Sequence, residues 1–279
     1  MLCWPCFFIP VGQLLREGEG DMMVKLVLAI LCMVQIPSGA AFSQPNAGGP
    51  PSINCLDCHS ELAPEKGAHP AVAMGCVSCH TGIDASDVPH KIKNKIAKGL
   101  SAEQPDLCYG CHDKSIFEKK VVHAAVGMGC TGCHNPHASK NSKLLTAEIP
   151  GLCYACHEKG KFGKKTVHPP VESGMCLSCH SPHASNDASL LLQPAGKLCS
   201  TCHEKQSSGK HVMAGYGLGD DHPLQGKADP SAPKRELSCI SCHNPHSSPG
   251  KKLLANGAAG PAELCLICHK KISVPSEGP

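Results

Sequence analysis

Aromatic side chains are scarce in this chain of 279 residues. Phe, Tyr and Trp together make up 3% of it, whereas Gly and Pro contribute 28 and 24 residues. Aromatic rings supply much of the buried area of an ordinary globular core, and Gly and Pro interrupt helices and strands. A length that would suit one or two conventional domains therefore comes with little side-chain bulk to fill them. Something other than side chains must fill the interior.

The chain also lacks a large net charge and, beyond its N-terminus, a long apolar run. Its formal net charge is +3, which gives no reason to expect a nucleic-acid partner. The basic stretch KIKNKIAK at residues 91–98 is most simply a solvated linker or short helix, with a docking patch for an acidic partner as the alternative. No segment after residue 43 is apolar and long enough to span a membrane. We therefore expect no transmembrane segment in the mature chain.

Residues 22–43, MMVKLVLAILCMVQIPSGAAFS, have the order of a secretory signal peptide: a Lys, an apolar run, then small residues suited to cleavage. We expect translation to start at Met22 or Met23 and the mature chain to begin near Gln44. Residues 3–6, CWPC, have no His after them and precede the signal, so we assign them no function. The protein is predicted to be exported, to the periplasm or to the outer-membrane or extracellular face.

Cysteine is abundant, with 21 residues, and the pattern C-x-x-C-H occurs nine times. This pattern is the signature of covalent haem c attachment, in which two thioethers hold the porphyrin and the His binds the iron. Every cysteine after residue 43 belongs to a motif, so none remains for a disulfide framework. Paired C-x-x-C sites can also bind zinc, but nine copies with a following His argue against zinc. The nine copies are Cys55/Cys58/His59, Cys76/Cys79/His80, Cys108/Cys111/His112, Cys130/Cys133/His134, Cys153/Cys156/His157, Cys176/Cys179/His180, Cys199/Cys202/His203, Cys239/Cys242/His243 and Cys265/Cys268/His269.

Nine further histidines remain, one for each of the nine expected irons. A single spare His is more often a surface or core residue, but a matching set at repeated positions indicates second axial ligands. The sequence therefore predicts nine covalently attached haems c with two histidine ligands each. The spare histidines are His69, His90, His123, His137, His168, His183, His211, His222 and His246.

The chain repeats in double units that each hold two motifs. Each of the four units has a first motif, a histidine before its second motif (the before-motif histidine), the second motif, and a histidine after it (the after-motif histidine). After residues 1–43, the doubtful N-terminal extension with the signal peptide, the predicted boundaries are residues 44–107 for unit 1, which is diverged, 108–152 for unit 2, 153–198 for unit 3, 199–264 for unit 4, which carries an insertion, and 265–279 for a half unit with one motif and a tail.

The stretch CTGCHNPHAS shows what the after-motif histidine can do. His137 follows His134 by three residues, and Pro136 keeps the segment from continuing as a helix. So short a segment cannot pass around a porphyrin edge, so His137 cannot bind the opposite face of the iron that His134 binds. We expect His137, His183 and His246 to bind in trans to the next haem. The alternative is that the Pro-His pair is only a turn beside a haem.

Two spare histidines are irregular. His90 lies ten residues after His80 instead of three, which makes its role the least regular of its class. His211 lies in the insertion of unit 4 and has no counterpart in the other units. Because the half unit supplies no spare histidine for its own haem, we assign His211 to the last haem. Met213 is the alternative ligand there, through its sulfur.

The predicted fold is mostly irregular, with short α-helices and little or no β-sheet, and it is an elongated multihaem cytochrome c with a stacked haem chain. Haem supplies the apolar interior that so few bulky side chains cannot. One short helix is expected at residues 118–122, EKKVV, and turns rich in Pro and Gly make up most of the rest. Each haem also adds two propionates, which offset the positive charge of the chain.

From residue 54 to residue 269 the chain resembles the multihaem cytochromes c with doubled C-x-x-C-H motifs, in the blocks LCYACH, VHPPV and CLSCHSPHAS. More loosely it is similar to periplasmic cytochromes that pass electrons through an outer-membrane porin. The resemblance implies an electron carrier and not an enzyme, with a role in anaerobic respiration or extracellular electron transfer. Its implied partners are a redox donor and acceptor, with an outer-membrane porin as a candidate.

Two alternatives stay open. A multihaem reductase, for nitrite, hydroxylamine or a sulfur oxyanion, would need one iron with an open face and acid or base groups beside it. A subunit of an extracellular cytochrome filament would donate a distal histidine to the next copy. The identity of donor and acceptor, the order of potentials and the oligomeric state are not fixed by the sequence.

Overall fold

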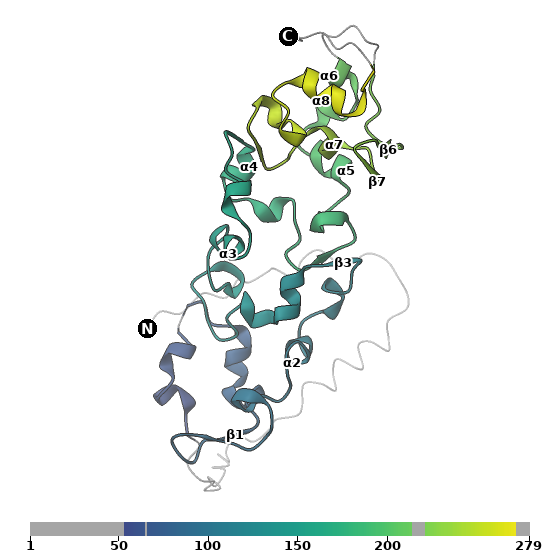
Figure 1. Ribbon diagram of the computed structural model, residues 1–279. Coiled ribbons are helices and arrows are strands. Elements are labelled where there is room, and N and C mark those ends of the chain that lie inside the picture. The colour runs from purple at the N-terminus through teal and green to yellow at the C-terminus, as the bar shows by residue number, and fades with distance from the viewer. Residues whose placement is uncertain (1–52, 65, 214–220, 272–279) are drawn as a thin grey trace, which may run out of the picture. The chain divides into compact units, whose positions relative to one another are not determined.

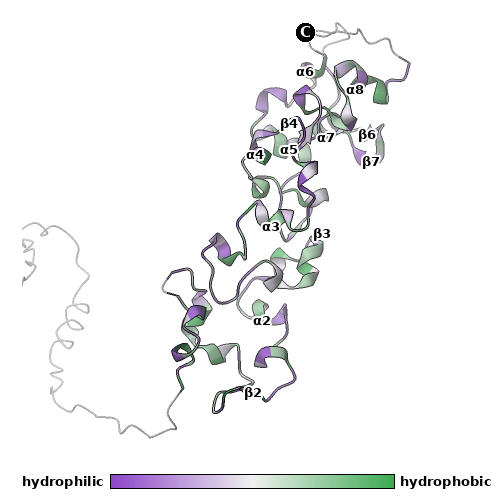
Figure 2. Cartoon of the chain, turned by 60° about the vertical axis from the view of Figure 1, so that its left-hand side comes forward, coloured by the Kyte–Doolittle hydropathy of each residue, from purple (hydrophilic) through white to green (hydrophobic). Residues whose placement is uncertain are grey.

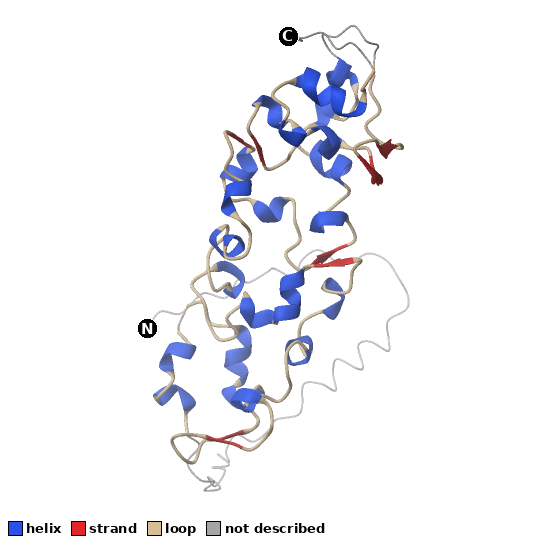
Figure 3. Cartoon of the chain, in the orientation of Figure 1, coloured by secondary structure: helices blue, strands red, loops and turns tan. Residues whose placement is uncertain are grey.

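The structure, a computed structural model, describes residues 53–64, 66–213 and 221–271. The signal expected at residues 22–43 and the C-x-x-C of residues 3–6 lie outside the described residues. Short helical segments joined by turns and loops make up most of the described chain (Figures 1 and 3). The α-helices are α2 Asp106–Tyr109, α3 Gly151–Tyr154, α4 Pro169–Glu172, α5 Ala195–Ser200, α6 Lys210–Met213, α7 Cys239–Cys242 and α8 Pro261–Cys268.

Single 3-10 turns outnumber the α-helices among the described residues. Such turns are the usual result where Gly, Pro and short motif segments leave no room for longer helices. They are η1 Cys55–Asp57, η2 Ser60–Leu62, η3 Pro70–Met74, η4 Cys76–Ser78, η5 Ala97–Gly99, η6 Lys114–Ile116, η7 Ala124–Met128, η8 Cys130–Gly132, η9 Ser142–Leu144, η10 Lys159–Lys161, η11 Cys176–Ser178, η12 Ala188–Leu190, η13 Glu204–Gln206, η14 Lys251–Leu253 and η15 Ala255–Gly257.

The strands are short and pair only two at a time, in antiparallel fashion. Two of the pairs are local hairpins, β1 with β2 and β6 with β7. The other two pairs, β3 with β5 and β4 with β8, join different units. The strands are β1 Ile83–Asp84, β2 Lys91–Ile92, β3 Val121–Val122, β4 Thr166–Val167, β5 Ala184–Ser185, β6 Ala228–Asp229, β7 Ala232–Glu236 and β8 Ser247–Ser248.

The pairs between units follow one rule. The strand residues just before a before-motif histidine pair with those just after the after-motif histidine of the following unit, as Val122 does with Ala184. The backbone N–H of His123 then donates to the carbonyl of His183 at 2.8 Å. The same bond joins His168 to His246 at 3.0 Å and His69 to His137 at 2.6 Å. Units 1 to 4 are therefore joined in sequence order, and each junction lies beside one spare histidine from each of the two units.

The polypeptide itself provides little core. Among the described residues the buried apolar side chains are Ala184, Leu237, Leu254, Ala255 and Ala258. Twelve large apolar side chains are exposed instead, and seven of them lie within a C-x-x-C-H motif or within two residues of one. Figure 2 shows hydrophobic residues spread along the described chain and not gathered at one centre. The apolar surface therefore lies beside the motifs, where a porphyrin can contact it.

The predicted fold class is confirmed: the described chain is mostly irregular, with short helices and only two-stranded sheets. The helix expected at residues 118–122 is wrong, because Val121 and Val122 form strand β3. Both are β-branched residues, which favour an extended backbone when a partner strand is present. The longest helix, α8, has eight residues. Within the described ranges none of the helices has the length and apolar character needed to cross a bilayer.

Candidate haem-binding sites

Each C-x-x-C-H motif forms one helical turn that closes on its own first cysteine. In all nine motifs the backbone N–H of the histidine donates to the carbonyl of the first cysteine, at 2.9 to 3.1 Å. Residues separated by three and four positions lie on one face of such a turn. The two sulfur atoms and the imidazole are therefore presented together, as covalent attachment of a haem with one axial ligand requires.

Eight of the nine motif histidines face a spare histidine across a constant gap. The ring centroids of these eight pairs are 5.8 to 6.2 Å apart. The pairs are His59 with His90, His69 with His112, His80 with His137, His123 with His157, His134 with His183, His168 with His203, His180 with His246 and His222 with His269.

The gap fits one metal ion between two imidazoles. A metal–imidazole bond is about 2 Å long, so two bonds in line account for about 4 Å. The remaining distance corresponds to half the width of each of the two rings. Direct ring-to-ring stacking would not need such even spacing in eight separate places. The residues therefore fit haem iron held between two histidines.

The pairing follows a register between units. Each before-motif histidine faces the first motif of the following unit, as His69 faces His112 and His123 faces His157. Each after-motif histidine of units 2 to 4 faces the second motif of the preceding unit, as His183 faces His134. The prediction that His137 reaches a haem other than its own agrees with this geometry. The predicted direction is wrong, because His137, His183 and His246 lie opposite the previous unit and not the next one.

The two irregular histidines lie near the two motifs that obtain no histidine from a neighbouring unit. His90 faces His59, the first motif, which has no preceding unit. The assignment of His211 to the last haem is wrong, because His222 faces His269 at 6.1 Å. His211 lies close enough to Cys239 for its charge to lower the pKa of that thiol, after the larger effect of the hydrogen bond with Cys199. It is thus near the motif of His243, the one motif histidine that faces no other imidazole among the described residues.

The cysteines of successive motifs lie beside one another in sequence order. Within each unit the first cysteines of the two motifs lie close enough for one thiol to shift the pKa of the other, as with Cys108 and Cys130; burial and then Cys130 raise the pKa of Cys108 to about 11. Between units, the second cysteine of one unit's second motif lies near a cysteine of the following motif, close enough for the charge of one thiolate to affect the pKa of the other thiol. The eight contacts are Cys55 with Cys76, Cys79 with Cys108, Cys108 with Cys130, Cys133 with Cys153, Cys153 with Cys176, Cys179 with Cys202, Cys199 with Cys239, and Cys242 with Cys268.

Three predicted attachment cysteines differ from the rest, although the sequence treats all eighteen alike. Cys58, Cys111 and Cys156, the second cysteines of the first motifs in units 1 to 3, are exposed and take part in none of these eight contacts. The physical reason is that the neighbouring motif lies against the first cysteine of the turn, as Cys130 lies against Cys108, so no motif covers the second. The structure therefore leaves these three thiols open to solvent, and their bonds to haem stay a prediction from the motif.

The equivalent cysteines of the last two first-type motifs are exposed as well. Cys202 and Cys268 are open to solvent, yet each lies within charge range of the second motif before it, through Cys179 and Cys242. Every other motif cysteine is partly buried. Exposure of the second cysteine is thus a property of the first motif of each unit and of the half unit.

Backbone carbonyls orient many of the histidines. In each unit the Nδ1–H of the second-motif histidine donates to a carbonyl about ten to twenty residues downstream, as His134 does to Lys143 at 2.9 Å. The accepting residue has a positive φ of 55° to 59° in all four units. A non-glycine residue adopts this conformation at a cost, so it indicates a functional constraint. The four bonds are His80 to Lys98, His134 to Lys143, His180 to Ser189 and His243 to Lys252.

The after-motif histidines of units 2 to 4 make no such bond to a carbonyl of the described chain, whereas His90 of unit 1 bonds to the carbonyl of Asp87. Burial first, and then the charge of nearby imidazoles, lower the pKa values of His137, His183 and His246. A lowered pKa favours neutral imidazole, the form that binds metals. Phe117 packs against His183 with centroids 4.9 Å apart, and Phe162 against His246 at 5.0 Å.

These two phenylalanines belong to aromatic pairs that the sequence reasoning did not single out. Phe117 contacts Tyr109 at 5.6 Å, and Phe162 contacts Tyr154 at 5.8 Å. Each tyrosine lies inside a first motif, between the two cysteines. Within the residues that the structure describes, these four side chains are all the Phe, Tyr and Trp residues. The scarce aromatic residues are thus placed between the first motif of units 2 and 3 and a distal histidine.

A buried carboxylate near the last two motifs, paired with an exposed arginine, was also missed. Asp229 is fully buried and accepts hydrogen bonds from Ser231 and from the guanidinium of Arg235. Burial alone raises the pKa of Asp229, but the bonds from Ser231, Arg235 and Ser241 outweigh it and hold the pKa well below its usual range. Its negative charge also adds to the effect of burial in raising the pKa of Cys268. Nothing in the sequence pattern of the insertion marks Asp229 as buried.

Comparison with known families agrees with this arrangement. The family described as doubled CXXCH motif matches residues 69–117, 123–162, 168–208 and 232–274. Each matched segment joins the second motif of one unit to the first motif of the following one. Three of the four begin at a before-motif histidine and contain the motif histidine that it faces. No curated protein matches the chain.

Proposed function

Because the chain belongs to the doubled C-x-x-C-H family and is a multihaem c-type cytochrome of electron transfer, we propose that it carries electrons along nine haems attached in sequence order. Each iron is bound by two histidines. The observation that carries the proposal is that the cysteines of each motif lie near those of the following motif, in an unbroken series along the chain. Haems attached at adjacent cysteines are neighbours, so an electron can pass from each to the next.

Haem c supplies a one-electron iron centre when it is bound. The chain's own residues hold it by two thioethers and offer an imidazole on each side. A histidine on both faces leaves no iron coordination site for a substrate. Carbonyl bonds to Nδ1, of the kind His134 makes with Lys143, fix the tautomer and raise the basicity of the ligand. Two histidine ligands favour lower potentials than His and Met together, which suits anaerobic respiration or extracellular electron transfer.

The proposal includes export and redox partners. The signal-like order of residues 22–43 supports a periplasmic or cell-surface location. The expected partners are a redox donor and a redox acceptor, with an outer-membrane porin as a candidate. The absence of a strong basic excess gives no support to a nucleic-acid partner.

The reductase alternative depends on a single haem, that of Cys239/Cys242. A reductase needs an iron with an open face. Eight motif histidines face a second imidazole, so the haem of Cys239/Cys242 is where an open face would lie if His211 did not bind. The filament alternative has less support, because the pairing and His211 use every spare histidine within one chain.

Haem counting and spin state test the proposal together. Holoprotein matured with its haems should have the intact mass of the mature chain plus nine haems. Its oxidised EPR spectrum should contain only low-spin iron, and its reduced form should not bind carbon monoxide. A mass below nine haems would overturn the count. One haem that is high-spin or binds carbon monoxide would overturn complete bis-histidine ligation and favour a reductase.

A further inference from the structure

The angle between facing imidazole planes separates the ends of the haem line from its interior. In six interior pairs the planes are 9° to 31° apart. The angle is 57° between His59 and His90, the pair of the first motif. It is 79° between His222 and His269, the pair of the last motif. The interior pairs are nearly parallel, and the two end pairs are crossed.

The position of the hydrogen-bond acceptor distinguishes two of the interior pairs from the two end pairs. An Nδ1–H bond lies in the plane of the ring, so its acceptor determines how the ring is turned. In the interior, His123 and His168 donate to the carbonyls of Pro182 and Pro245, which lie in the following unit just before an after-motif histidine. The strand pairs between units hold those prolines in equivalent places.

At the ends no such neighbour is available, and the acceptors are local. The Nδ1–H of His222 donates to the carbonyl of Pro223, the next residue, at 3.0 Å. The Nδ1–H of His90 donates to the carbonyl of Asp87 at 2.8 Å. Because both acceptors lie within three residues of the histidine, they turn the ring to a different angle from that set by an acceptor in another unit.

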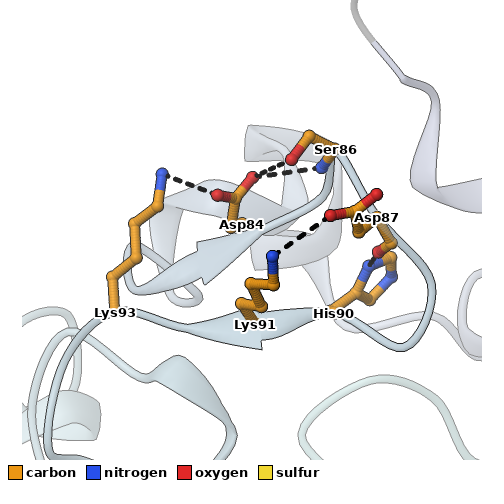
Figure 4. A network of polar contacts seen from close by, with 6 residues as sticks. All are labelled: Asp84, Ser86, Asp87, His90, Lys91 and Lys93. Atoms are coloured by element: carbon orange, nitrogen blue, oxygen red, sulfur yellow. Dashed lines mark hydrogen bonds and ion pairs between the residues drawn. The ribbon is translucent and has the colours of Figure 1, made fainter.

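The loop that presents His90 is held by polar contacts, shown in Figure 4. Asp84 accepts hydrogen bonds from the N–H and hydroxyl of Ser86 at 3.1 and 2.7 Å. It also pairs with Lys93 at 3.1 Å, and Asp87 pairs with Lys91 at 3.3 Å. These contacts span hairpin β1–β2 on both sides of His90. These polar contacts therefore hold the loop, and with it the orientation of the His90 ring.

Resting on the proposed function, we infer that the first and last haems are electronically distinct from the interior ones because their axial imidazoles are crossed, and that the carbonyls of Asp87 and Pro223 are the positioning groups that cross them. Parallel imidazoles donate π density to the same iron orbital and separate the two π orbitals in energy. Crossed imidazoles donate to different orbitals and leave the two nearly equal. These two haems are the first and the last in sequence order.

EPR of the oxidised holoprotein reads this difference directly, because nearly equal orbitals give a strongly anisotropic low-spin signal and separated ones a rhombic signal. The wild type should show at least two haem equivalents of the strongly anisotropic type and at least six of the rhombic type. In His222→Ala the strongly anisotropic signal should fall by one haem equivalent, and one high-spin haem should appear. In the matched interior variant His123→Ala the rhombic signal should fall instead.

A second end variant, His90→Ala, gives an independent reading if His222→Ala does not mature. It should also remove one strongly anisotropic haem. The inference is overturned if either end variant reduces the rhombic signal, or if all wild-type haems give one signal type while remaining low-spin. That result would leave the proposed electron carrier intact. A high-spin or carbon monoxide-binding haem in the wild type would instead count against the proposed function.

Discussion

Units 2 and 3 differ from the two ends of the chain in where each motif obtains its second imidazole. Inside the repeat, His123 faces the motif of His157 in the following unit, and His183 faces the motif of His134 in the preceding unit. At the start, the first motif uses His90 from its own unit. Near the C-terminal end, the motif of His243 lies beside His211 from the insertion.

The difference teaches why the irregular histidines exist. In a repeat where each motif takes its distal histidine from a neighbouring unit, one motif near each end has no neighbour to supply that histidine. Within the described residues, the motifs of His59 and His243 are the two that no neighbouring unit supplies with an imidazole. His90 faces His59 from the same unit, and we propose His211 for the motif of His243. The two histidines that depart from the repeat thus match the two motifs that the exchange leaves out.

The largest expected effect comes from removing the inserted histidine. His211→Ala should convert one haem from low-spin to high-spin, because the haem of Cys239/Cys242 loses its second ligand. EPR and carbon monoxide binding of the holoprotein measure the change. In a Cys265→Ala/Cys268→Ala background, which lacks the last haem, His211→Ala should still produce one high-spin haem. No high-spin haem in that background would return His211 to the last haem.

Next in size is the ion pair that holds the C-terminal insertion. Asp229→Ala removes the buried carboxylate that accepts hydrogen bonds from Ser231 and from the exposed guanidinium of Arg235, and should destabilise the holoprotein by about 3 kcal/mol. The midpoint of thermal unfolding measures the loss. Asp187→Ala, which removes a carboxylate without an ion pair in the described structure, is the control and should stay near the wild type. Equal midpoints for the two variants would contradict a structural role for Asp229.

Substitutions in the left-handed turn after a second motif should change the stability by a smaller amount. The change should be a loss for Gly99→Ala in unit 1 and a gain for Lys143→Gly in unit 2. A Cβ at Gly99 would lie 2.9 Å from the backbone nitrogen of Ile83, so Gly99→Ala should destabilise by about 2 kcal/mol. Lys143 holds a φ of 56° in unit 2. Lys143→Gly should relieve that strain and stabilise by about 1 kcal/mol. Thermal midpoints should rank Gly99→Ala, wild type, Lys143→Gly; the reverse order would refute the strain argument.

The smallest expected effect concerns the loop of His90. Hydrogen bonds from the Ser86 side chain and N–H, and then Lys93, lower the pKa of Asp84 from 3.8 to about 2. Because the folded-state pKa is depressed, the stabilising contribution is present above about pH 4 and is lost as the pH falls towards 2. Asp84→Asn should remove this pH dependence and leave a small high-spin fraction at the first haem at neutral pH.

Asp113→Asn is the matched control for Asp84→Asn. Asp113 makes the same contacts with Ser115 that Asp84 makes with Ser86, and its pKa is lowered by the same cause, but its turn carries no distal ligand. EPR between pH 4 and pH 2 compares the two. The same loss of low-spin signal in both variants would mean that the Asp84 loop does not hold His90.

The sequence predicts the attachment chemistry and the irregular fold because both are local. A C-x-x-C-H turn closes within five residues, as the bond from His134 to Cys130 shows. The even match of spare histidines to motifs also follows from counting. The partner of each histidine does not, because His69 and His112 are brought together by contacts between units and not by spacing along the chain.

The misassignment of His211 has the same origin. Sequence order places His222 nearer to the motif of His243, whereas the structure turns it to His269 and leaves His211 beside Cys239. The carbonyl of Lys143 could not be found either, since a backbone acceptor has no residue signature. Val121 with Val122, and Thr166 with Val167, are pairs of β-branched residues and thus local signals for a strand.

The measurement that tests the register most directly is a double-variant comparison at His137. His137→Ala alone should give one high-spin haem. In a Cys76→Ala/Cys79→Ala background, which lacks the haem opposite His137, the same substitution should add no high-spin haem, because its haem is already gone. If His137→Ala still creates a high-spin haem in that background, His137 serves another iron and the exchange of ligands between units is contradicted.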